Sequence, residues 1–298
     1  MMNKVVENRK IYFLISAILI LAGVVMYFVN GGFMQDVDFV GGMTMYVEMG
    51  KDVDLDEVAQ LVQDSTPEIA TPIVQKSDGT QIVIKTTPIE TEVREAVQTA
   101  IIEKYELDET AILSVDNVSP VIGSELRTQA FSAAIIAAVL MMLYISIRFT
   151  FKTGVAAVVA LLHDVLIMLA VYAAFKIPVN SSFIAAILTI IGYSINNTIV
   201  VFDRIRENVK KDKRTPFNET INKSLGQTLG RSISTTITTL IPVIMIYALG
   251  VNSIREFAFP IIIGLLAGTY SSLFVAGSVW YMLDNLQKKI KNRKLKKA

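Results

Sequence analysis

The sequence predicts a polytopic α-helical membrane protein with six transmembrane helices in a 1 + 5 arrangement and a small extracytoplasmic domain after the first helix. Three observations predict this class. Hydrophobic residues make up 52% of the 298 residues and charged residues only 18%, whereas soluble domains average about 25% charged. Six apolar runs are long enough to cross a bilayer, and the charges between them are distributed very unevenly. A single soluble globular domain and a disordered chain are both excluded.

The composition also excludes several kinds of chemistry. The chain contains no cysteine, which excludes a disulfide scaffold, a Cys-ligated zinc site and thiol catalysis. It contains one histidine, too few for a His-rich metal site. We therefore expect no metal, no cofactor and no enzymatic activity.

The first apolar run covers residues 11–29 and follows a short cytoplasmic N-terminus, residues 1–10. A helix rises about 1.5 Å per residue, so this run just crosses a hydrocarbon core of ~30 Å. The basic residues Lys4, Arg9 and Lys10 would also suit a signal peptide. However, the run is long for such a peptide, and residues 27–30 (Tyr-Phe-Val-Asn) lack the small side chains of a cleavage site. We interpret it as a retained anchor.

The sequence pattern over residues 30–127 predicts an extracytoplasmic α+β domain with its linkers. Strand-like alternation and helix-start signals follow one another in the order β-α-β-β-α-β, at residues 43–49, 54–64, 73–75, 81–86, 87–105 and 111–118. This order is typical of a ferredoxin-like sandwich. The segment has no histidine, no cysteine and no Gly-rich phosphate loop, which favours a binding or lever role over chemistry.

A five-helix membrane bundle is expected over residues 128–283. Its apolar runs are residues 128–147, 154–175, 181–202, 232–249 and 257–283. A cytoplasmic loop, residues 203–231, connects the third and fourth runs of this set, and a basic cytoplasmic tail covers residues 284–298. Within that loop, residues 215–229 begin like a helix and have an amphipathic pattern, so we expect them to lie along the membrane surface.

Charge assigns the sides of the membrane. Residues 30–127 carry 6 Lys/Arg against 19 Asp/Glu, whereas residues 203–231 carry 8 basic and 4 acidic residues. The tail carries 7 basic residues and 1 acidic residue. Because Lys/Arg-rich connections stay in the cytoplasm, we expect both termini to be cytoplasmic and the acidic loop to be extracytoplasmic. The net charge of +1 is an average over these unlike parts.

Polar residues within the apolar runs are candidates for function, because a charged side chain near the bilayer centre costs at least about 2.5–3.5 kcal/mol. They are His163 and Asp164, Asn196 and Asn197, and Arg231 with six Ser/Thr residues at positions 232–239. Each also has a structural explanation: a mutually satisfied pair, hydrogen bonding between helices, or an arginine reaching the membrane edge. Together they predict one polar core on the third, fourth and fifth helices, with the second and sixth helices serving packing.

Several short motifs point to one family. They are Asp38-Phe39-Val40-Gly41-Gly42, Ser119-Pro120-Val121-Ile122-Gly123-Ser124-Glu125-Leu126, Leu161-Leu162-His163-Asp164, Gly192-Tyr193-Ser194-Ile195-Asn196, Val201-Phe202-Asp203-Arg204 and Gly230-Arg231-Ser232. Together they resemble the SecD/SecF family of protein-export membrane proteins, within the RND superfamily. The resemblance covers nearly the whole chain.

The resemblance implies an RND-type half-transporter in the bacterial cytoplasmic membrane. Such a half pairs with SecD, a homologous six-helix half, beside the SecYEG channel, with YidC and YajC as further candidate partners. It uses the ion-motive force to promote export of a translocating preprotein. Among the motif residues it implies motif or hinge roles for Asp38, Gly41, Gly42, Pro120, Gly123, Glu125, Gly192, Asp203 and Arg204.

One departure from the family pattern concerns the ion path. The family usually has an aspartate, acting as an ion relay, where this chain has Asn197, while the arginine partner is present as Arg231. An amide does not titrate, so the relay role does not transfer to position 197. Three explanations remain: a carboxylate in the SecD partner with Asn197 as its hydrogen-bonding neighbour, Asp164 tuned by His163, or Na⁺ as the coupling ion in place of H⁺.

Other functions are weighed against this one. They are an RND-type half-transporter for a small hydrophobic substrate, an insertion chaperone with no ion coupling, and an intramembrane protease using Asp164 and Asp203. The protease requires two acids at similar depth, whereas Asp203 follows the end of its apolar run. The basic cytoplasmic segments favour anionic membrane lipids. Nucleic acid is not an expected partner.

Overall fold

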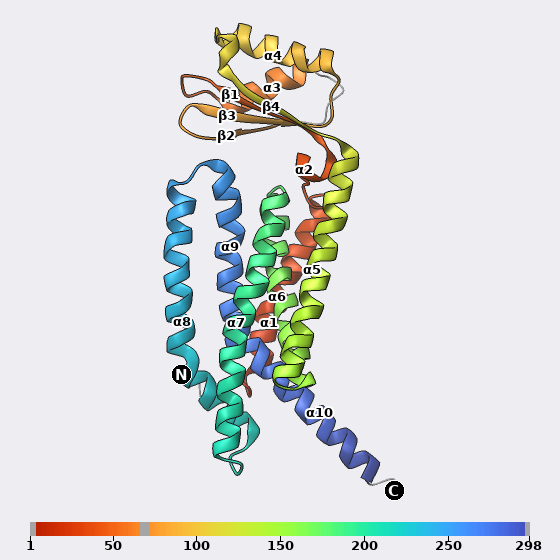
Figure 1. Ribbon diagram of the computed structural model, residues 1–298, viewed down its shortest axis with the longest axis vertical. Helices are drawn as coiled ribbons and strands as arrows, with labels where there is room; N and C mark the ends of the chain where they lie inside the picture. Colours follow the sequence, from red (N-terminus) through yellow and green to blue (C-terminus); the bar gives the residue numbers. More distant parts are fainter. Residues whose placement is uncertain (1–3, 66–71, 296–298) are drawn as a thin grey trace.

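The computed structural model describes residues 4–65 and 72–295, so the outermost three residues of each expected terminus lie outside it. Within these ranges six helical spans are long and apolar enough to cross a membrane (Figure 1). They are α1 (Arg9–Val29), α5 (Pro120–Arg148), α6 (Phe151–Phe175), α7 (Ser181–Lys211), α8 (Phe217–Leu249) and a continuous sixth span of α9 (Asn252–Tyr270), η2 (Ser271–Ala276) and α10 (Gly277–Leu295). The predicted six spans, one followed by five, are confirmed.

The helices extend well beyond the apolar runs. Helix α7 continues to Lys211 and α8 begins at Phe217, so most of the predicted loop at residues 203–231 is helical. The helix start expected near residue 215 is confirmed, because α8 begins at Phe217, and residues 217–229 continue directly into its apolar part. Their position along the membrane surface stays a prediction. A helix satisfies its own backbone groups, so it has no need to end where the side chains become polar. A five-residue connection follows α7, and Pro216 precedes the first turn of α8.

A four-stranded antiparallel sheet lies at one end of the molecule. Its strands are β1 (Gly42–Glu48), β2 (Ile73–Lys76), β3 (Gln81–Thr86) and β4 (Ile112–Val118), in the spatial order β2-β3-β1-β4. Helices α3 (Leu55–Ser65) and α4 (Thr91–Tyr105) cover the face that points away from the bundle, and η1 (Glu109–Ala111) leads into β4 (Figure 1). Alternate residues of β1, such as Met43 and Met45, are fully buried in this small core.

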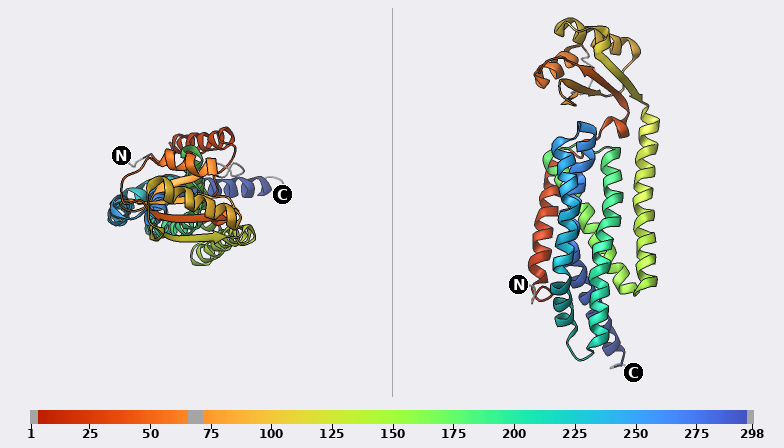
Figure 2. Two further views of the ribbon diagram at one scale, coloured as in Figure 1. Left: turned by 90° about the horizontal axis from the view of Figure 1, so that it is seen from above. Right: turned by 60° about the vertical axis from the view of Figure 1, so that its left-hand side comes forward.

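The membrane bundle has a buried centre and two exposed edges. Helices α6 and α7 supply most of the buried side chains, among them Met168, Phe183 and Phe202. Helices α5 and α8 run along opposite edges of the bundle (Figures 1 and 2). Both expose large apolar side chains; Ile147 at the end of α5 is 86% exposed and Ile241 on α8 is 57% exposed. Lipid or another protein must cover these edges.

Candidate functional site

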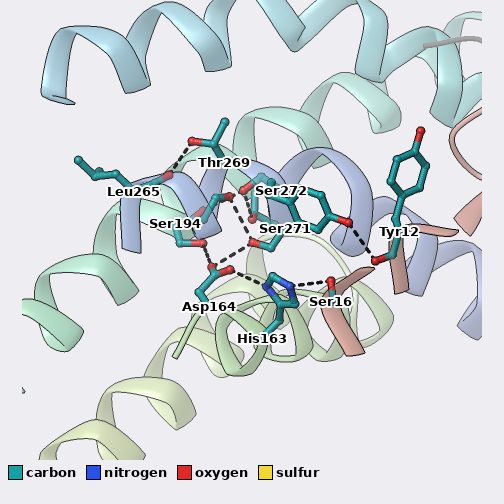
Figure 3. Close-up of polar contacts among 12 residues, drawn as sticks. Tyr12, Ser16, His163, Asp164, Ser194, Leu265, Thr269, Ser271 and Ser272 are labelled. Carbon is teal, nitrogen blue, oxygen red and sulfur yellow. Dashed lines mark hydrogen bonds and ion pairs between the residues drawn. The ribbon is translucent and has the colours of Figure 1, made fainter. Parts of the chain in front are cut away.

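A network of hydrogen bonds surrounds Asp164, which is fully buried in the middle of α6 (Figure 3). Its Oδ2 accepts from Ser194 Oγ at 2.6 Å and from Ser271 Oγ at 3.0 Å. Its Oδ1 lies 3.0 Å from Nδ1 of His163. When the carboxyl group is ionised it only accepts hydrogen bonds, and Nδ1 then donates to it. The carboxylate is therefore held by donors from α6, α7 and η2.

His163 extends this network to the first helix. Its Nε2 lies 2.9 Å from Ser16 Oγ in α1. The imidazole stacks on the ring of Tyr270, with 5.8 Å between centroids, and the Tyr270 hydroxyl donates to the carbonyl oxygen of Tyr12 at 2.9 Å. The His163–Asp164 pair thus joins four parts of the bundle: α1, α6, α7 and the sixth span.

The sixth span contributes polar side chains through a π-helical turn, η2. Ser271 reaches Asp164 (Figure 3). Ser272 Oγ lies 2.9 Å from Thr198 Oγ1 on α7. Turns of this kind often occur at functional sites. The expectation that the sixth helix serves only packing is therefore wrong. Serine within a long apolar run gave no signal, because a hydroxyl can also bond to its own helix.

Asn197 lies on α7 outside this network and is 4% exposed. Its Oδ1 accepts a long hydrogen bond from Thr235 Oγ1 of α8, at 3.5 Å. Its Nδ2 is buried and has no hydrogen-bond partner among the described residues. A buried amide donor without a partner costs free energy. Among the described residues, the Nδ2 of Asn197 therefore lacks a hydrogen-bond acceptor.

Arg231 stands on the exposed side of α8. Within residues 4–65 and 72–295, no hydrogen bond or ion pair joins its guanidinium to Asn197 or to any other group. Ser234 and Thr235 of the next turn are also exposed, and Asn196 faces outward from α7. The predicted core on the third, fourth and fifth helices is thus divided. Asp164 is enclosed, whereas α8 exposes Arg231 and Ser234, whose side chains have no partner among the described residues and which we call the unfinished polar face of α8.

A second polar cluster joins the sheet to the bundle. Lys85 of β3 donates to Asp36 Oδ2 at 2.7 Å, and its Nζ lies 3.7 Å from Glu256 Oε1 at the start of α9. Asn180 Nδ2, just before α7, donates to Glu256 Oε2 at 2.5 Å. The Lys85 and Asp36 side chains are only 12% and 1% exposed. Burial lowers the pKa of Lys85, but the carboxylates of Asp36 and Glu256 outweigh it and raise that pKa above its ordinary value.

This cluster was not predicted from the sequence. A lysine in an apolar strand and a glutamate near the start of an apolar run were its available signals. The predicted Asp38 lies beside it, where its Oδ2 accepts from the backbone N–H of Ser181 at 3.0 Å.

Three predicted glycines lie where α2 (Val37–Val40) packs closely against α5 and β3. Gly41 and Gly42 have φ angles of +79° and +149°. A Cβ on Gly41 would lie 2.6 Å from the nitrogen of Pro120, and one on Gly42 would lie 2.0 Å from a carbonyl oxygen of β3. A Cβ on Gly123 of α5 would lie 2.8 Å from a carbonyl group of α2. Only glycine allows the backbones to approach so closely.

The remaining predicted residues lie elsewhere. Glu125 is exposed on α5, where its Oε1 accepts from Gln129 Nε2 at 3.0 Å, and Gly192 has open space around its Cα. Arg204 donates to Gln227 Oε1 of α8 at 2.7 Å. Asp203 is exposed. It follows Ser194, the α7 contact of Asp164, by nine residues, or ~13 Å along the helix, so the two acids form no protease dyad.

The described part of the chain contains no group of three or more His, Cys, Asp or Glu residues placed to hold a metal ion. The chemistry available to the site is hydrogen bonding and proton exchange within the bundle, together with one buried amide donor, Asn197 Nδ2, that lacks an acceptor among the described residues.

Comparisons with known proteins agree with these motifs. The family model described as "Protein export membrane protein SecD/SecF, C-terminal" matches residues 97–286. The chain is 33% identical to the protein translocase subunit SecF of Sebaldella termitidis over 297 residues, which cover 98% of this chain and 95% of that protein. It is 35% identical to the protein translocase subunit SecDF of Bacillus subtilis, covering 92% of this chain and 37% of that one.

A solved structure of a SecDF protein is also similar to this chain. The crystal structure of SecDF from Thermus thermophilus, a translocon-associated membrane protein, superposes with a TM-score of 0.83 at 31% identity. The match covers 94% of this chain and 38% of the SecDF chain. The chain therefore spans about two fifths of the SecDF proteins and nearly the full length of the SecF protein.

The cluster at Lys85 yields a stability prediction. Replacing Lys85 with methionine leaves the buried Asp36 carboxylate without its cation, and breaking a buried ion pair costs about 3–5 kcal/mol. We expect Lys85→Met to lower the Tm of the full-length protein clearly in a thermal melt. Because the pKa of Lys85 is raised, the pair is complete at neutral pH and is lost only as the pH rises above its ordinary value of 10.5.

Lys76→Met is the matched control. The Lys76–Asp52 pair has a similar length, 2.6 Å, but its side chains are 51% and 82% exposed, so its loss should cost about 1 kcal/mol or less. Equal Tm losses in the two variants would contradict the assignment of Lys85 to a buried junction.

Proposed function

The chain belongs to the SecD/SecF family of protein-export membrane proteins, and from this premise we propose that it pairs with a SecD half and couples ion movement to protein export. It is a multi-pass protein of the bacterial membrane with a role in Sec translocation. The observation that carries the proposal is the unfinished polar face of α8 beside Asn197.

The proposed pairing with a SecD half is inferred from the unfinished polar face of α8. Lipid tails offer no hydrogen-bond partner to the exposed side chains of Arg231 and Ser234. A protein surface does, and the SecDF relatives carry additional chain in the same polypeptide. The SecD half is thus the partner that covers α8. SecYEG is the proposed neighbour of the pair, YidC and YajC are further candidates, and the translocating preprotein is the client.

The topology and the fold labels belong to the same proposal. Both termini are cytoplasmic and the acidic domain is extracytoplasmic, because the Lys/Arg-rich connections lie at the opposite end from the sheet. The strand order β2-β3-β1-β4 with helices on one face supports a ferredoxin-like classification. The whole chain then corresponds to one RND-type half-transporter.

The coupling carboxylate is assigned to the SecD half. Asn197 does not titrate, and the exposed guanidinium of Arg231 has no acceptor among the described residues, so this face requires one such as a carboxylate oxygen. A Na⁺ ion requires oxygen ligands instead, whereas the unpartnered group on this face is the cationic guanidinium of Arg231. The proposed coupling ion is therefore H⁺, carried by a partner carboxylate beside Asn197 and Arg231. No enzymatic step and no cofactor enter this function.

Asp164 has a positioning role in this proposal. All of its described hydrogen bonds are made within the chain, to His163, Ser194 and Ser271. These contacts fix the relative positions of α6, α7 and the sixth span, and through His163 they include α1. The carboxylate thereby orders the helices that place Asn197 at the partner.

Asn197→Asp tests the assignment of the coupling carboxylate. A carboxylate at this position adds a titratable group next to the partner's own. We expect the variant to retain export or improve it, with a stronger dependence on the proton gradient. The measurement is preprotein translocation into vesicles containing the full complex, with and without a protonophore. Abolished export would indicate a specific need for the amide.

Asp164→Asn tests the positioning role. The amide retains the size of the carboxylate but cannot accept all three hydrogen bonds, and each unsatisfied buried donor costs about 1–3 kcal/mol. We expect a lower Tm for the full-length protein, with the proportional response of export to the protonophore unchanged.

Ser278→Ala is the control for Asp164→Asn. The Ser278 hydroxyl is buried and, among the described residues, lacks a hydrogen-bond partner, so its removal should leave the Tm nearly unchanged. A normal Tm for Asp164→Asn together with a lost protonophore response would instead make Asp164 the relay.

A further inference from the structure

A cavity of about 770 Å³ lies at the end of the bundle opposite the sheet. Four elements line it: the first turn of α6, the last turns of α7, the connection into α8, and α10. These segments are far apart in sequence, and the network around Asp164 takes no part in the cavity. It is distinct from the site described above.

The cavity carries an excess of positive charge. Its basic lining residues are Lys152, Arg206, Lys210, Lys213, Arg214 and Lys288, and its acidic ones are Asp212 and Asp284. Both acids are already engaged. Asp284 pairs with Lys152 at 2.6 Å and with Lys288 at 2.8 Å. Asp212 accepts from the Thr215 hydroxyl at 2.6 Å.

Four of these cations therefore have no carboxylate partner within the described residues: Arg206, Lys210, Lys213 and Arg214. They come from the last turns of α7 and the short connection that follows. Like charges brought together around one cavity repel each other, and an anion placed among them relieves that repulsion. The cavity is thus charged to receive an anionic group such as a phosphate.

One wall of the cavity is aromatic. Phe149, Phe217 and Trp280 line it, and the Phe217 and Trp280 rings meet edge to face at 5.5 Å between centroids. Arg206 lies 5.6 Å from the centre of the Phe149 ring. Aromatic side chains of this kind gather at the membrane–water interface. A free phosphate ion makes no favourable contact with aromatic rings, whereas the glycerol and acyl parts of a lipid pack against them.

We propose that this cavity binds the headgroup of an anionic phospholipid, with the phosphate among the four unpaired cations and the glycerol region against the aromatic wall. Basic pockets between helices on the cytoplasmic side suit such headgroups. Placing the lipid in the cytoplasmic leaflet rests on the topology proposed above, but the binding itself does not. The bound lipid would link the ends of α6, α7, α8 and α10.

The test is lipid binding to the full-length protein purified in neutral detergent. Native mass spectrometry would compare phosphatidylglycerol with phosphatidylcholine, which share the glycerol and acyl parts and differ in net charge. We expect phosphatidylglycerol to be retained at least tenfold more strongly, and millimolar inorganic phosphate to displace little of it. Equal retention of both lipids, or full displacement by inorganic phosphate, would overturn the proposal.

A pair of variants with matched charge locates the site. Lys213→Gln with Arg214→Gln removes two unpaired cations of the cavity. Lys10→Gln with Lys211→Gln removes two exposed basic residues that do not line it. The first pair should lower phosphatidylglycerol binding about tenfold and the second less than twofold, with unchanged Tm in both. Equal losses would show a general effect of charge.

The lipid proposal and the export proposal can fail separately. Lipid binding is read on the isolated chain without partners, whereas export is read on the full complex. Normal export with absent lipid binding would overturn only the lipid site.

Discussion

Inside a bilayer every polar group needs a hydrogen-bond partner supplied by protein, and the arrangement of this molecule depends on that constraint. Asp164 satisfies it internally, because donors from α6, α7 and η2 converge on one carboxylate. Asn197 and Arg231 do not satisfy it within the described chain. The site around Asp164 therefore holds the helices of the bundle together, whereas the region of Asn197 and Arg231 requires a partner protein.

The same principle operates at the two ends of the bundle. At the sheet end, buried Lys85 is held between the carboxylate of Asp36, just before α2, and that of Glu256 in the bundle, so its charge is neutralised from both sides of the junction. At the other end, four cations around one cavity remain without a carboxylate among the residues described. One charged cluster is complete and joins two parts of the chain, whereas the other is incomplete and suited to an outside ligand.

The sequence predicted what depends on local pattern. Long apolar runs identified the six spans, and the position of His163 and Asp164 in a run indicated a buried polar pair. It did not reveal what depends on distant contacts. Asp36, Lys85 and Glu256 are far apart in the chain, and only the tertiary fold brings them together. Ser271 and Ser272 are unremarkable within an apolar run, and only the π-helical turn directs them to α6 and α7. Position 231 was identified, but its exposure was visible only in the fold.

The central claim is that a SecD half covers α8 at the level of Asn197, and cross-linking tests it most directly. The chain has no native cysteine, so a single cysteine can carry a photoactivatable benzophenone. Ser234→Cys places the probe on the exposed face of α8, and Ile136→Cys places it on exposed α5 at the opposite edge. In membranes that contain the full complex, the account predicts a strong cross-link to the SecD half from position 234 and little from position 136. A cross-link from position 136 alone, or none from position 234, would contradict it.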